Sequence, residues 1–588
     1  MPSRVPEGLL YALTAFGPLA FGCVEPWSTA GLEILCFSLA LACFLRGCRS
    51  VRKEICPAGA CGTSDTAGEL PTLAAWLWLL PAGLAGLGLL QLLLPLAPDW
   101  PRPLGPFTAA AYATRSAVLL WAAYAALLWS LPQVLATHEA VRRYCRVLWG
   151  LGAVFAAQGL LQAATGGSRL YWLRPTTLPA VFGPYYNRDH AASLLLMTLA
   201  MGIGVWASRL RRRPADGSAW TPGGLAAGVV LMFSGIAVCA SRGAFLAMPL
   251  AAALLGLLGA GFAPRARTRG LLAAGALAAA AVTVAFTFRH VGAAADAGAL
   301  VERSIAVRLA IYGDAGRWLR DAPLFGTGLG SFETVYPAYQ DSALAGLAAH
   351  AHSDWLELAL ETGLAGLLAA LAAAGLVLFG AARAWLRAAS GEMRALIAGA
   401  LGAAGAFAIH SLFEFGFQTP GNAVVAVGIA GLLASAPFWA DKAAPRVRPV
   451  APPGWAAAAA LLVFLGLAHA AAIPDPTRDP RRIRARAAEL YAQAGPGEKP
   501  DLDALRAALR LALAAAELRP FDYKALESAA AALERLGRPE DARVFWARSR
   551  SVRFTPVVVG AGDDEQAEAR RLAALRSLGL LPRRLEAR

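Results

Sequence analysis

Long apolar runs are the feature that most limits what this 588-residue chain can fold into. A helix needs about 20 mostly apolar residues to cross the hydrocarbon core of a membrane. Thirteen candidate spans lie near residues 7–23, 29–46, 72–96, 110–135, 145–164, 190–208, 221–239, 243–262, 270–288, 355–380, 394–412, 421–438 and 455–473. The first is short, and the pair on either side of Ser241–Arg242 also fits one broken helix. The pattern predicts an all-α, polytopic membrane protein of about 12–13 transmembrane helices.

The residue composition indicates that these apolar runs lie in lipid. Hydrophobic residues make up 57% of the chain and charged residues 16%, whereas an ordinary soluble domain is about 45–50% apolar and about 25% charged. This excess of apolar residues excludes a soluble enzyme with a single core, and it also excludes a disordered chain.

Basic residues alternate between the predicted loops and indicate an orientation. The net charge is +15, which in a soluble protein would suggest a nucleic-acid partner. Here 21 basic residues lie in one alternating set of short loops, and the rest of the membrane region holds 11. The positive-inside rule makes the first set cytoplasmic. We therefore expect a cytoplasmic N-terminus, a C-terminal domain on the outer side and no nucleic-acid partner.

Three regions of the chain differ in composition. Residues 1–474 form the predicted membrane domain, and about 289–354 within it is a long outer loop with a helix-like stretch at 305–320. Loops of this length without spans are usually functional. Residues 475–588 carry helical patterns at 481–494, 501–518, 523–536 and 538–550. The LGRPEDA link and the spacing resemble a tetratricopeptide repeat. We expect a small soluble helical domain that binds a partner or only packs.

Histidines gather at the predicted outer face, and His138 alone is predicted inside. His352, in the segment HAHSDW that opens the tenth span, has a side chain suited to proton transfer near neutral pH. The His350–His352 spacing also raises a metal hypothesis, but zinc needs a third protein ligand, and neither an HExxH motif nor a CxxC pair supplies one. An interfacial histidine that caps a helix start is the plainest alternative. We expect no metal, no cofactor and no disulfide framework.

Three arginines fall at or near the same predicted face. Arg242 lies between two apolar stretches, Arg188 just before the sixth span, and Arg308 in the outer loop. A guanidinium binds phosphate bidentately and stays charged, so converging arginines suit a diphosphate. Each could equally be an interfacial anchor or an ion-pair partner of an aspartate, and the candidates are Asp189, Asp314 and Asp321.

Two further patterns flank His352. Three acidic residues follow it at helical spacing and so share one face, namely Asp354, Glu357 and Glu361. We expect one of them to orient the imidazole or a sugar hydroxyl, or to pair with a loop arginine. The run Phe325–Ser331, FGTGLGS, lacks the lysine of a phosphate loop and the last glycine of GxGxxG. We interpret it as a tight turn that fixes the outer loop.

Five segments in order resemble the bacterial O-antigen ligase and O-antigen polymerase family. They are FGPYYNRDHAA, ASRGA, RLAIYGDAGRWLRDAPLFGTGLGSF, HAHSDWLELALETG and HSLFEFGFQTPGNA, between about residues 180 and 425. The resemblance implies a C-type glycosyltransferase fold in the bacterial inner membrane. It also implies transfer of a glycan from a polyprenyl diphosphate carrier to an acceptor hydroxyl at the outer face, without a nucleotide sugar or a metal. The implied acceptor is a lipid A core, another glycan or a protein.

The resemblance also implies roles for single residues. The family's catalytic histidine falls on His352, and its two essential arginines fall on Arg242 and Arg308. Arg188 and His190 match a further polar motif, and we expect substrate contacts from them and from Asp354, His350 and His410. The sequence departs from the common pattern at Asp189, Tyr312, Ser353 and Glu414.

Two other classes of function stay open at this point. A transporter of lipid-linked glycans would also have many spans and buried arginines, although such proteins often show internal repeats and charges at the midplane. A structural or sensory membrane protein would use the C-terminal domain for binding and would leave the Arg–His set unexplained. Within the resembling family, polymerase and protein O-oligosaccharyltransferase activities are alternatives to ligase activity.

Overall fold

The computed structural model describes residues 4–54, 77–93, 106–166, 169–175, 181–210, 221–248, 295–336, 339–340, 348–440, 480–495, 500–518 and 523–552. The chain divides into two compact units that do not follow its linear order. Unit 1 comprises Met1–Ala82, Leu120–Ala297 and Ala370–Ala468, and unit 2 comprises Gly83–Leu119, Gly298–Ala369 and His469–Arg588. The predicted domains 1–474 and 475–588 and the loop about 289–354 stay predictions.

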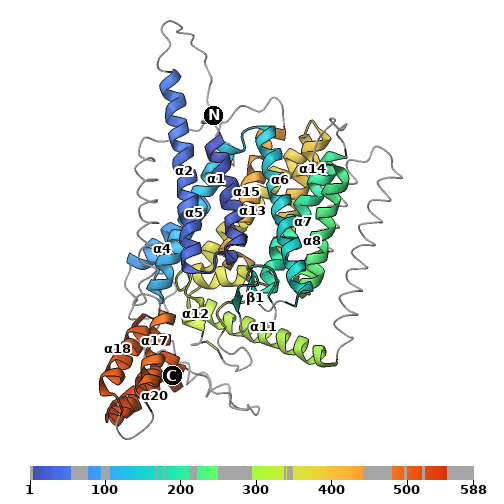
Figure 1. Ribbon diagram of the computed structural model, residues 1–588. Helices are drawn as coiled ribbons and strands as arrows, with labels where there is room; N and C mark the ends of the chain where they lie inside the picture. The colour runs from blue at the N-terminus through green and yellow to red at the C-terminus, as the bar shows by residue number, and fades with distance from the viewer. Residues whose placement is uncertain are drawn as a thin grey trace. The chain divides into compact units, whose positions relative to one another are not determined.

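The protein is an all-α, multi-pass membrane protein. Among the described residues, eight helices are long and apolar enough to cross a membrane. They are α2 (Pro26–Glu54), α5 (Ala111–Val134), α6 (His138–Ala164), α7 (Arg188–Arg209), α8 (Pro222–Cys239), α13 (Asp354–Arg387), α14 (Gly391–His410) and α15 (Pro420–Ala440). These eight confirm spans that the sequence predicts. The ribbon in Figure 1 shows them as long rods.

One of the predicted spans is a shorter helix in the structure, and another is described only in part. The run at 7–23 gives only α1 (Val5–Leu19), which ends two residues before a 3₁₀ turn, η2 (Phe21–Cys23), with Gly22 in the left-handed region. Of the run at 72–96, residues 77–93 are described, and they contain α4 (Leu79–Leu93). Hydropathy counts apolar residues and does not detect where a turn interrupts the backbone hydrogen bonds. The predicted spans at 270–288 and 455–473, and most of 243–262, lie outside the described residues.

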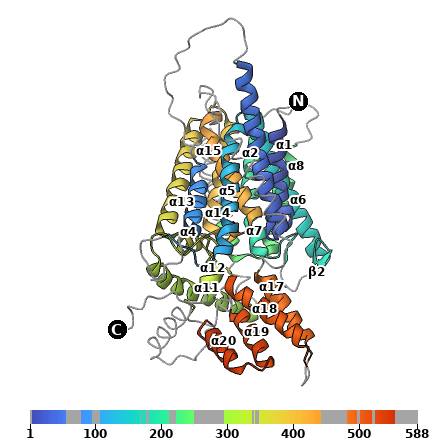
Figure 2. The ribbon, with the colours of Figure 1, turned by 90° about the vertical axis from the view of Figure 1, so that its left-hand side faces the viewer.

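Helix α7 is one of the most enclosed helices of unit 1. It packs against α6, α8, α14 and α15, and it is apolar on all sides, as a helix surrounded by other helices must be. Gly204 of α7 faces Gly399 of α14, and a Cβ on Gly204 would lie 2.8 Å from the Gly399 Cα. Small residues allow such backbone contact between membrane helices. Both ribbon views show the long helices of unit 1 running beside one another (Figure 2).

Hydrogen bonds define the two ends of unit 1. At the end that we call the basic end, Arg143 near the start of α6 binds Glu7 of α1 through two hydrogen bonds of 3.0 Å. Arg142 binds Glu392 at the start of α14 in the same way, at 2.8 and 2.9 Å. At the opposite end, which we call the site end, a hairpin of β1 (Arg169–Leu170) and β2 (Arg174–Pro175) follows α6. There the Tyr171 hydroxyl donates to the carbonyl of Leu19 at 2.5 Å.

Unit 2 has its own aromatic core. It contains α11 (Ala295–Asp321), the short α12 (Phe332–Val335) and the first turns of α13. Trp318 stacks between Phe332 and Tyr339, with ring centroids 5.5 and 5.4 Å away. Leu526 of the C-terminal region is buried in the same cluster, and Phe545 packs against it. The C-terminal helices therefore complete the core that also holds α11.

The C-terminal region is helical, as its sequence predicts. Helices α17 (Pro480–Gln493), α18 (Leu502–Leu518), α19 (Tyr523–Arg535) and α20 (Pro539–Val552) pack as successive neighbours. Their contacts are built from alanines and short aliphatic chains around Ile483 and Ala512. The resemblance to a tetratricopeptide repeat stays a prediction.

Candidate functional site

A glutamate holds the chain just before His352 in unit 2. The Glu357 side chain is 2% exposed. Its Oε1 accepts a hydrogen bond from His350 Nδ1, and its Oε2 accepts one from the backbone N–H of Ala351, both at 2.8 Å. One carboxylate thus binds a side chain and a main-chain group on adjacent residues. Carboxylate hydrogen bonds are stronger than neutral ones, so this clamp fixes the path of residues 350–351.

His352 has an unusual backbone conformation directly after this clamp. Its φ is 53°, in the left-handed region that residues other than glycine, asparagine and aspartate rarely adopt. The hydroxyl of Tyr312 donates to the carbonyl of His352 at 3.2 Å, and Ser353 accepts from the N–H of Leu356 at the start of α13. Backbone strain of this kind persists where the surroundings impose it, and it is concentrated at functional sites.

Arg308 lies on the helix that supports His352. It is half-buried on α11, one helical turn before Tyr312. Residues four apart share one face of a helix, so α11 presents the Arg308 guanidinium on the face that contacts the His352 segment. Asp354 is the first residue of α13 and is also half-buried. Unit 2 therefore gathers four of the predicted site residues, which are Arg308, His350, His352 and Asp354.

The surroundings of His350 favour its protonated form. Burial lowers the pKa of its imidazole, but the Glu357 carboxylate raises it by more, so the pKa lies above its usual value. The Oε1 of Glu361 accepts from the N–H of Phe332 at 3.0 Å. Of the three acidic residues on this face, Glu357 binds an imidazole, that of His350. The expectation that one of them orients the imidazole of His352 stays a prediction.

The segment Phe325–Ser331 is a tight turn that fits into a break in α13. Gly326, Gly328 and Gly330 all have positive φ. Gly363 interrupts α13 with φ 68° and ψ −172°, and the carbonyls of Leu360 and Glu361 accept from the N–H groups of Thr327 and Gly328. A Cβ on Gly363 would lie 2.2 Å from the backbone of Leu324. The turn thus replaces the helical hydrogen bonds that the break removes.

In unit 1, His190 belongs to a buried polar network at the site end. Its Nδ1 hydrogen-bonds with the Thr419 hydroxyl at 2.7 Å, and its carbonyl accepts from Asn422 Nδ2 at 2.9 Å. The hydroxyl of Tyr185 donates to Asn422 Oδ1 at 2.9 Å. Arg188 begins α7 two residues before His190, after Asn187 as N-cap. The network fixes the start of α7 against the start of α15.

Arg242 follows a break in its helix, in agreement with one interpretation of the sequence. Helix α8 ends at Cys239, Ala240 is left-handed, and a helix resumes at residue 242. His410, at the end of α14, hydrogen-bonds through Nδ1 with Ser193 at 2.9 Å. Its ring lies directly against Gly243, where a Cβ would be 3.0 Å from Nε2. Because Gly243 has no side chain, His410 reaches the backbone next to Arg242.

Unit 1 therefore brings the other four predicted site residues, Arg188, His190, Arg242 and His410, to its site end. Sequence reasoning missed the residues that hold them, namely Tyr185, Ser193, Thr419 and Asn422. Thr419 and Asn422 stand in the segment HSLFEFGFQTPGNA, so polar residues inside an apolar motif were the available signal. Among the described residues, no group of three or more His, Cys, Asp and Glu side chains is arranged to hold a metal ion.

A comparison with protein families now bears on these observations. Residues 227–371 match the family model described as O-antigen ligase. This region of the chain is similar to O-antigen ligases, and we call it the ligase domain. The matched residues include Arg242, Arg308, His350, His352 and Asp354, and they span parts of both units. No curated protein matches the chain.

This ligase domain gives the helices and polar clusters a functional setting. It supports an O-antigen ligase-like or polymerase-like role in membrane glycan transfer, with lipid-linked glycan donors and glycan acceptors as the substrate classes. The Arg188–His190 network and His410 lie outside the matched residues.

Proposed function

We propose that this protein transfers a glycan from a polyprenyl diphosphate carrier to an acceptor hydroxyl at the outer face of the bacterial inner membrane. The observation that carries the proposal is His352. It is half-buried, left-handed at φ 53° and fixed by the Glu357 clamp and the Tyr312 hydroxyl, within the ligase domain. An imidazole fixed in this way is suited to remove a proton from one particular hydroxyl.

The proposed reaction is a single displacement at the anomeric carbon of the glycan. The acceptor oxygen forms the new bond to that carbon while its proton passes to the imidazole of His352. The bond from the anomeric carbon to the phosphate oxygen breaks, and the electron pair leaves with the diphosphate. Arg242 and Arg308 bind the diphosphate and stabilise the negative charge that develops on it. Because a lipid diphosphate is a good leaving group, no metal or acid is required for this step.

The remaining site residues bind or position the substrates in this proposal. The Glu357 carboxylate favours the protonated form of His350, which adds positive charge near His352. Arg188, His190 and His410 contact the carrier or the glycan at the site end of unit 1, and Asp354 contacts a sugar hydroxyl. The arginine pairs at the basic end of unit 1 support a cytoplasmic location for that end. The site end then faces outward, where lipid-linked glycans are consumed.

The test is a transfer assay with full-length protein purified in detergent. A polyprenyl-diphosphate oligosaccharide is supplied with a chelator and, in separate reactions, a lipid A core, a free glycan or a protein. We expect the wild type to consume the carrier and His352→Ala to lose at least 100-fold in turnover while still binding the carrier. His138→Ala, which changes a histidine at the basic end, is the matched control and should keep full activity.

The acceptor that gains mass distinguishes a ligase from a polymerase and from a protein glycosyltransferase. Carrier consumption that is equal in the wild type and in His352→Ala would overturn the role of His352 as base. Movement of labelled carrier across proteoliposomes without any consumption would overturn the transferase proposal in favour of a transporter.

A further inference from the structure

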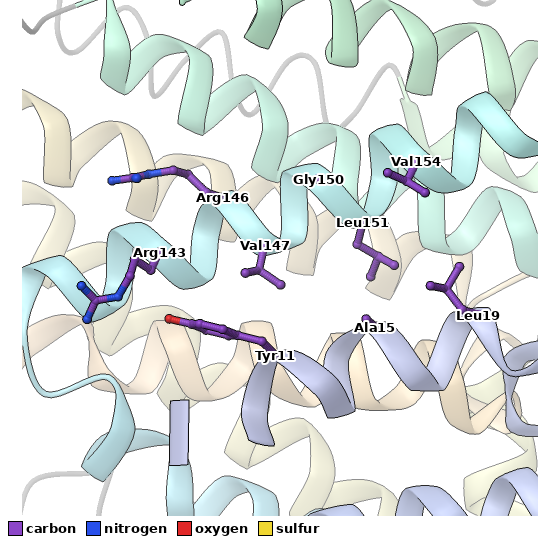
Figure 3. A pocket seen from close by; sticks show the side chains of 9 residues that line it. All are labelled: Tyr11, Ala15, Leu19, Arg143, Arg146, Val147, Gly150, Leu151 and Val154. Atoms are coloured by element: carbon purple, nitrogen blue, oxygen red, sulfur yellow. The ribbon is translucent and has the colours of Figure 1, made fainter. Parts of the chain in front are cut away.

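An elongated apolar groove runs between α1 and α6 of unit 1. Its volume is about 490 Å³. Tyr11, Ala15 and Leu19 line it from α1 at intervals of four residues, and Val147, Gly150 and Val154 line it from α6. Figure 3 shows Arg143 and Arg146 at one end and Leu19 and Val154 at the other. The groove belongs neither to the His190 network nor to the His352 segment.

Small residues create the groove. Gly150 lies half-way along α6, and a Cβ placed there would meet no atom within 4 Å. Ala15 occupies the middle of the α1 wall, between the larger Tyr11 and Leu19. The two helices are therefore held apart by the larger residues on either side, and the space above Gly150 and Ala15 stays open. Val154 at the apolar end is 60% exposed. This end of the groove is therefore suited to contact with hydrocarbon.

The charges at the other end determine what kind of molecule fits. Arg146 is 30% exposed and lies 4.0 Å from Glu139 Oε1, and Glu139 is 51% exposed. Ion pairs at this end join three guanidiniums to three carboxylates on α6, α1 and α14, namely Arg142, Arg143, Arg146, Glu139, Glu7 and Glu392. Tyr11 adds a hydroxyl bonded to Glu7. A ligand with one phosphate and one ammonium can join this network through both of its charges, whereas an anion can bind only the guanidiniums.

The polarity of the groove separates this ligand from the carrier of the proposed reaction. The carrier would place its diphosphate at the site end, whereas the guanidiniums of the groove lie at the basic end. A phospholipid in the leaflet on the basic side has the required direction, with its phosphate at that surface and its chains pointing toward the bilayer centre.

We propose that the α1–α6 groove binds one acyl chain of a zwitterionic aminophospholipid. The phosphate of this lipid binds Arg146, and its ammonium group binds Glu139. The acyl chain fills the open space beside Gly150 and Ala15, and the head-group contacts fix the position of the lipid along the groove. The bound lipid covers the exposed side of α1. Elsewhere this helix of 15 residues packs on α2, α6 and α15.

Native mass spectrometry of the full-length protein tests this proposal without any glycan substrate, so its outcome is independent of the transferase proposal. Purified protein is equilibrated with equal amounts of phosphatidylethanolamine and phosphatidylglycerol in detergent. We expect one retained phosphatidylethanolamine per protein. Gly150→Leu fills the groove and should lower retention at least tenfold, and Arg146→Gln should lower it several-fold.

Gly375→Leu is the matched control, because Gly375 is also a helical glycine whose Cβ would meet nothing. It should retain the lipid as the wild type does. Ala15→Leu fills the groove from the opposite wall and provides a second test if Gly150→Leu does not fold. Unchanged retention in folded Gly150→Leu or Ala15→Leu would overturn the site. Preferential retention of phosphatidylglycerol would overturn the pairing of ammonium with Glu139.

Discussion

Replacing Glu357 by glutamine tests whether the clamp on residues 350–351 positions His352. The carboxylate accepts two hydrogen bonds at 2.8 Å while almost fully buried. Glutamine keeps one acceptor oxygen, which can still bind the N–H of Ala351, but it turns a donor toward His350 and removes the negative charge. The lost bond to a charged group corresponds to about 1.5–3 kcal/mol.

If this free energy is also lost from the transition state, turnover falls by ~10- to 100-fold, since each 1.36 kcal/mol is a factor of about ten. The assay is carrier consumption by full-length protein, with carrier affinity measured separately. Glu392→Gln is the matched control, because Glu392 also binds a partner through both oxygens, at the basic end of unit 1. It should lower thermal stability and leave turnover unchanged.

The same variant changes the pH dependence. The raised pKa of His350 means that the ion pair with Glu357 stabilises the fold fully below the pKa of an unfolded histidine. That contribution is lost as the pH rises through the higher, folded value. We expect the wild type to lose thermal stability as the pH rises through that interval and Glu357→Gln to lack the loss. Turnover of folded Glu357→Gln within twofold of the wild type, at all pH values, would refute the positioning role of the clamp.

Three further variants test the packing and the proposed phosphate contact. Gly363→Ala should abolish folding or activity, because its Cβ would lie 2.2 Å from the backbone of Leu324 and its φ is 68°. Its control, Gly375→Ala in an open helical position, should raise stability by up to about 1 kcal/mol. Leu526→Ala should cost about 2–5 kcal/mol and lower turnover by loosening the aromatic core of unit 2, measured by thermal unfolding beside carrier consumption. Arg308→Lys should raise the KM for the carrier about tenfold, because a lysine cannot bind phosphate bidentately.

Each of these expectations can fail clearly. A normal melting temperature for Gly363→Ala would contradict the break in α13, and a stability loss for Leu526→Ala no larger than that of Leu502→Ala, at an exposed site, would contradict its place in the core. An unchanged KM for Arg308→Lys, with normal expression, would count against a phosphate contact at that residue.

The sequence predicts the helical architecture well because hydropathy and periodicity are local. The pattern at 523–536 becomes α19 (Tyr523–Arg535), and the helix-like stretch at 305–320 is the C-terminal part of α11. The break at Ser241–Arg242 is also visible beforehand, because an arginine there interrupts an apolar run. For the span predicted at 72–96, the structure describes residues 77–93, which contain α4 (Leu79–Leu93).

The geometry of the candidate site is less accessible from the sequence. The spacing of Asp354, Glu357 and Glu361 shows that they share a face, but only the fold determines that Glu357 binds His350 and Glu361 binds Phe332. The left-handed backbone at His352 could not be predicted from the residue type, because the position holds neither a glycine nor an asparagine. The contact of Leu526 with the aromatic core joins residues about 200 positions apart, and no local pattern carries that information.

This last contact has a consequence for how the protein is made. The aromatic core around Trp318 belongs to the middle of the chain, yet Leu526 and Phe545 come from its final part. Synthesis proceeds from the N-terminus, and contacts between distant residues form late. During translation the His352 segment therefore stays incompletely supported until the C-terminal helices have emerged. We therefore expect a chain truncated before Leu526 to lack the proposed transfer activity, because the core beneath the His352 segment would be incomplete.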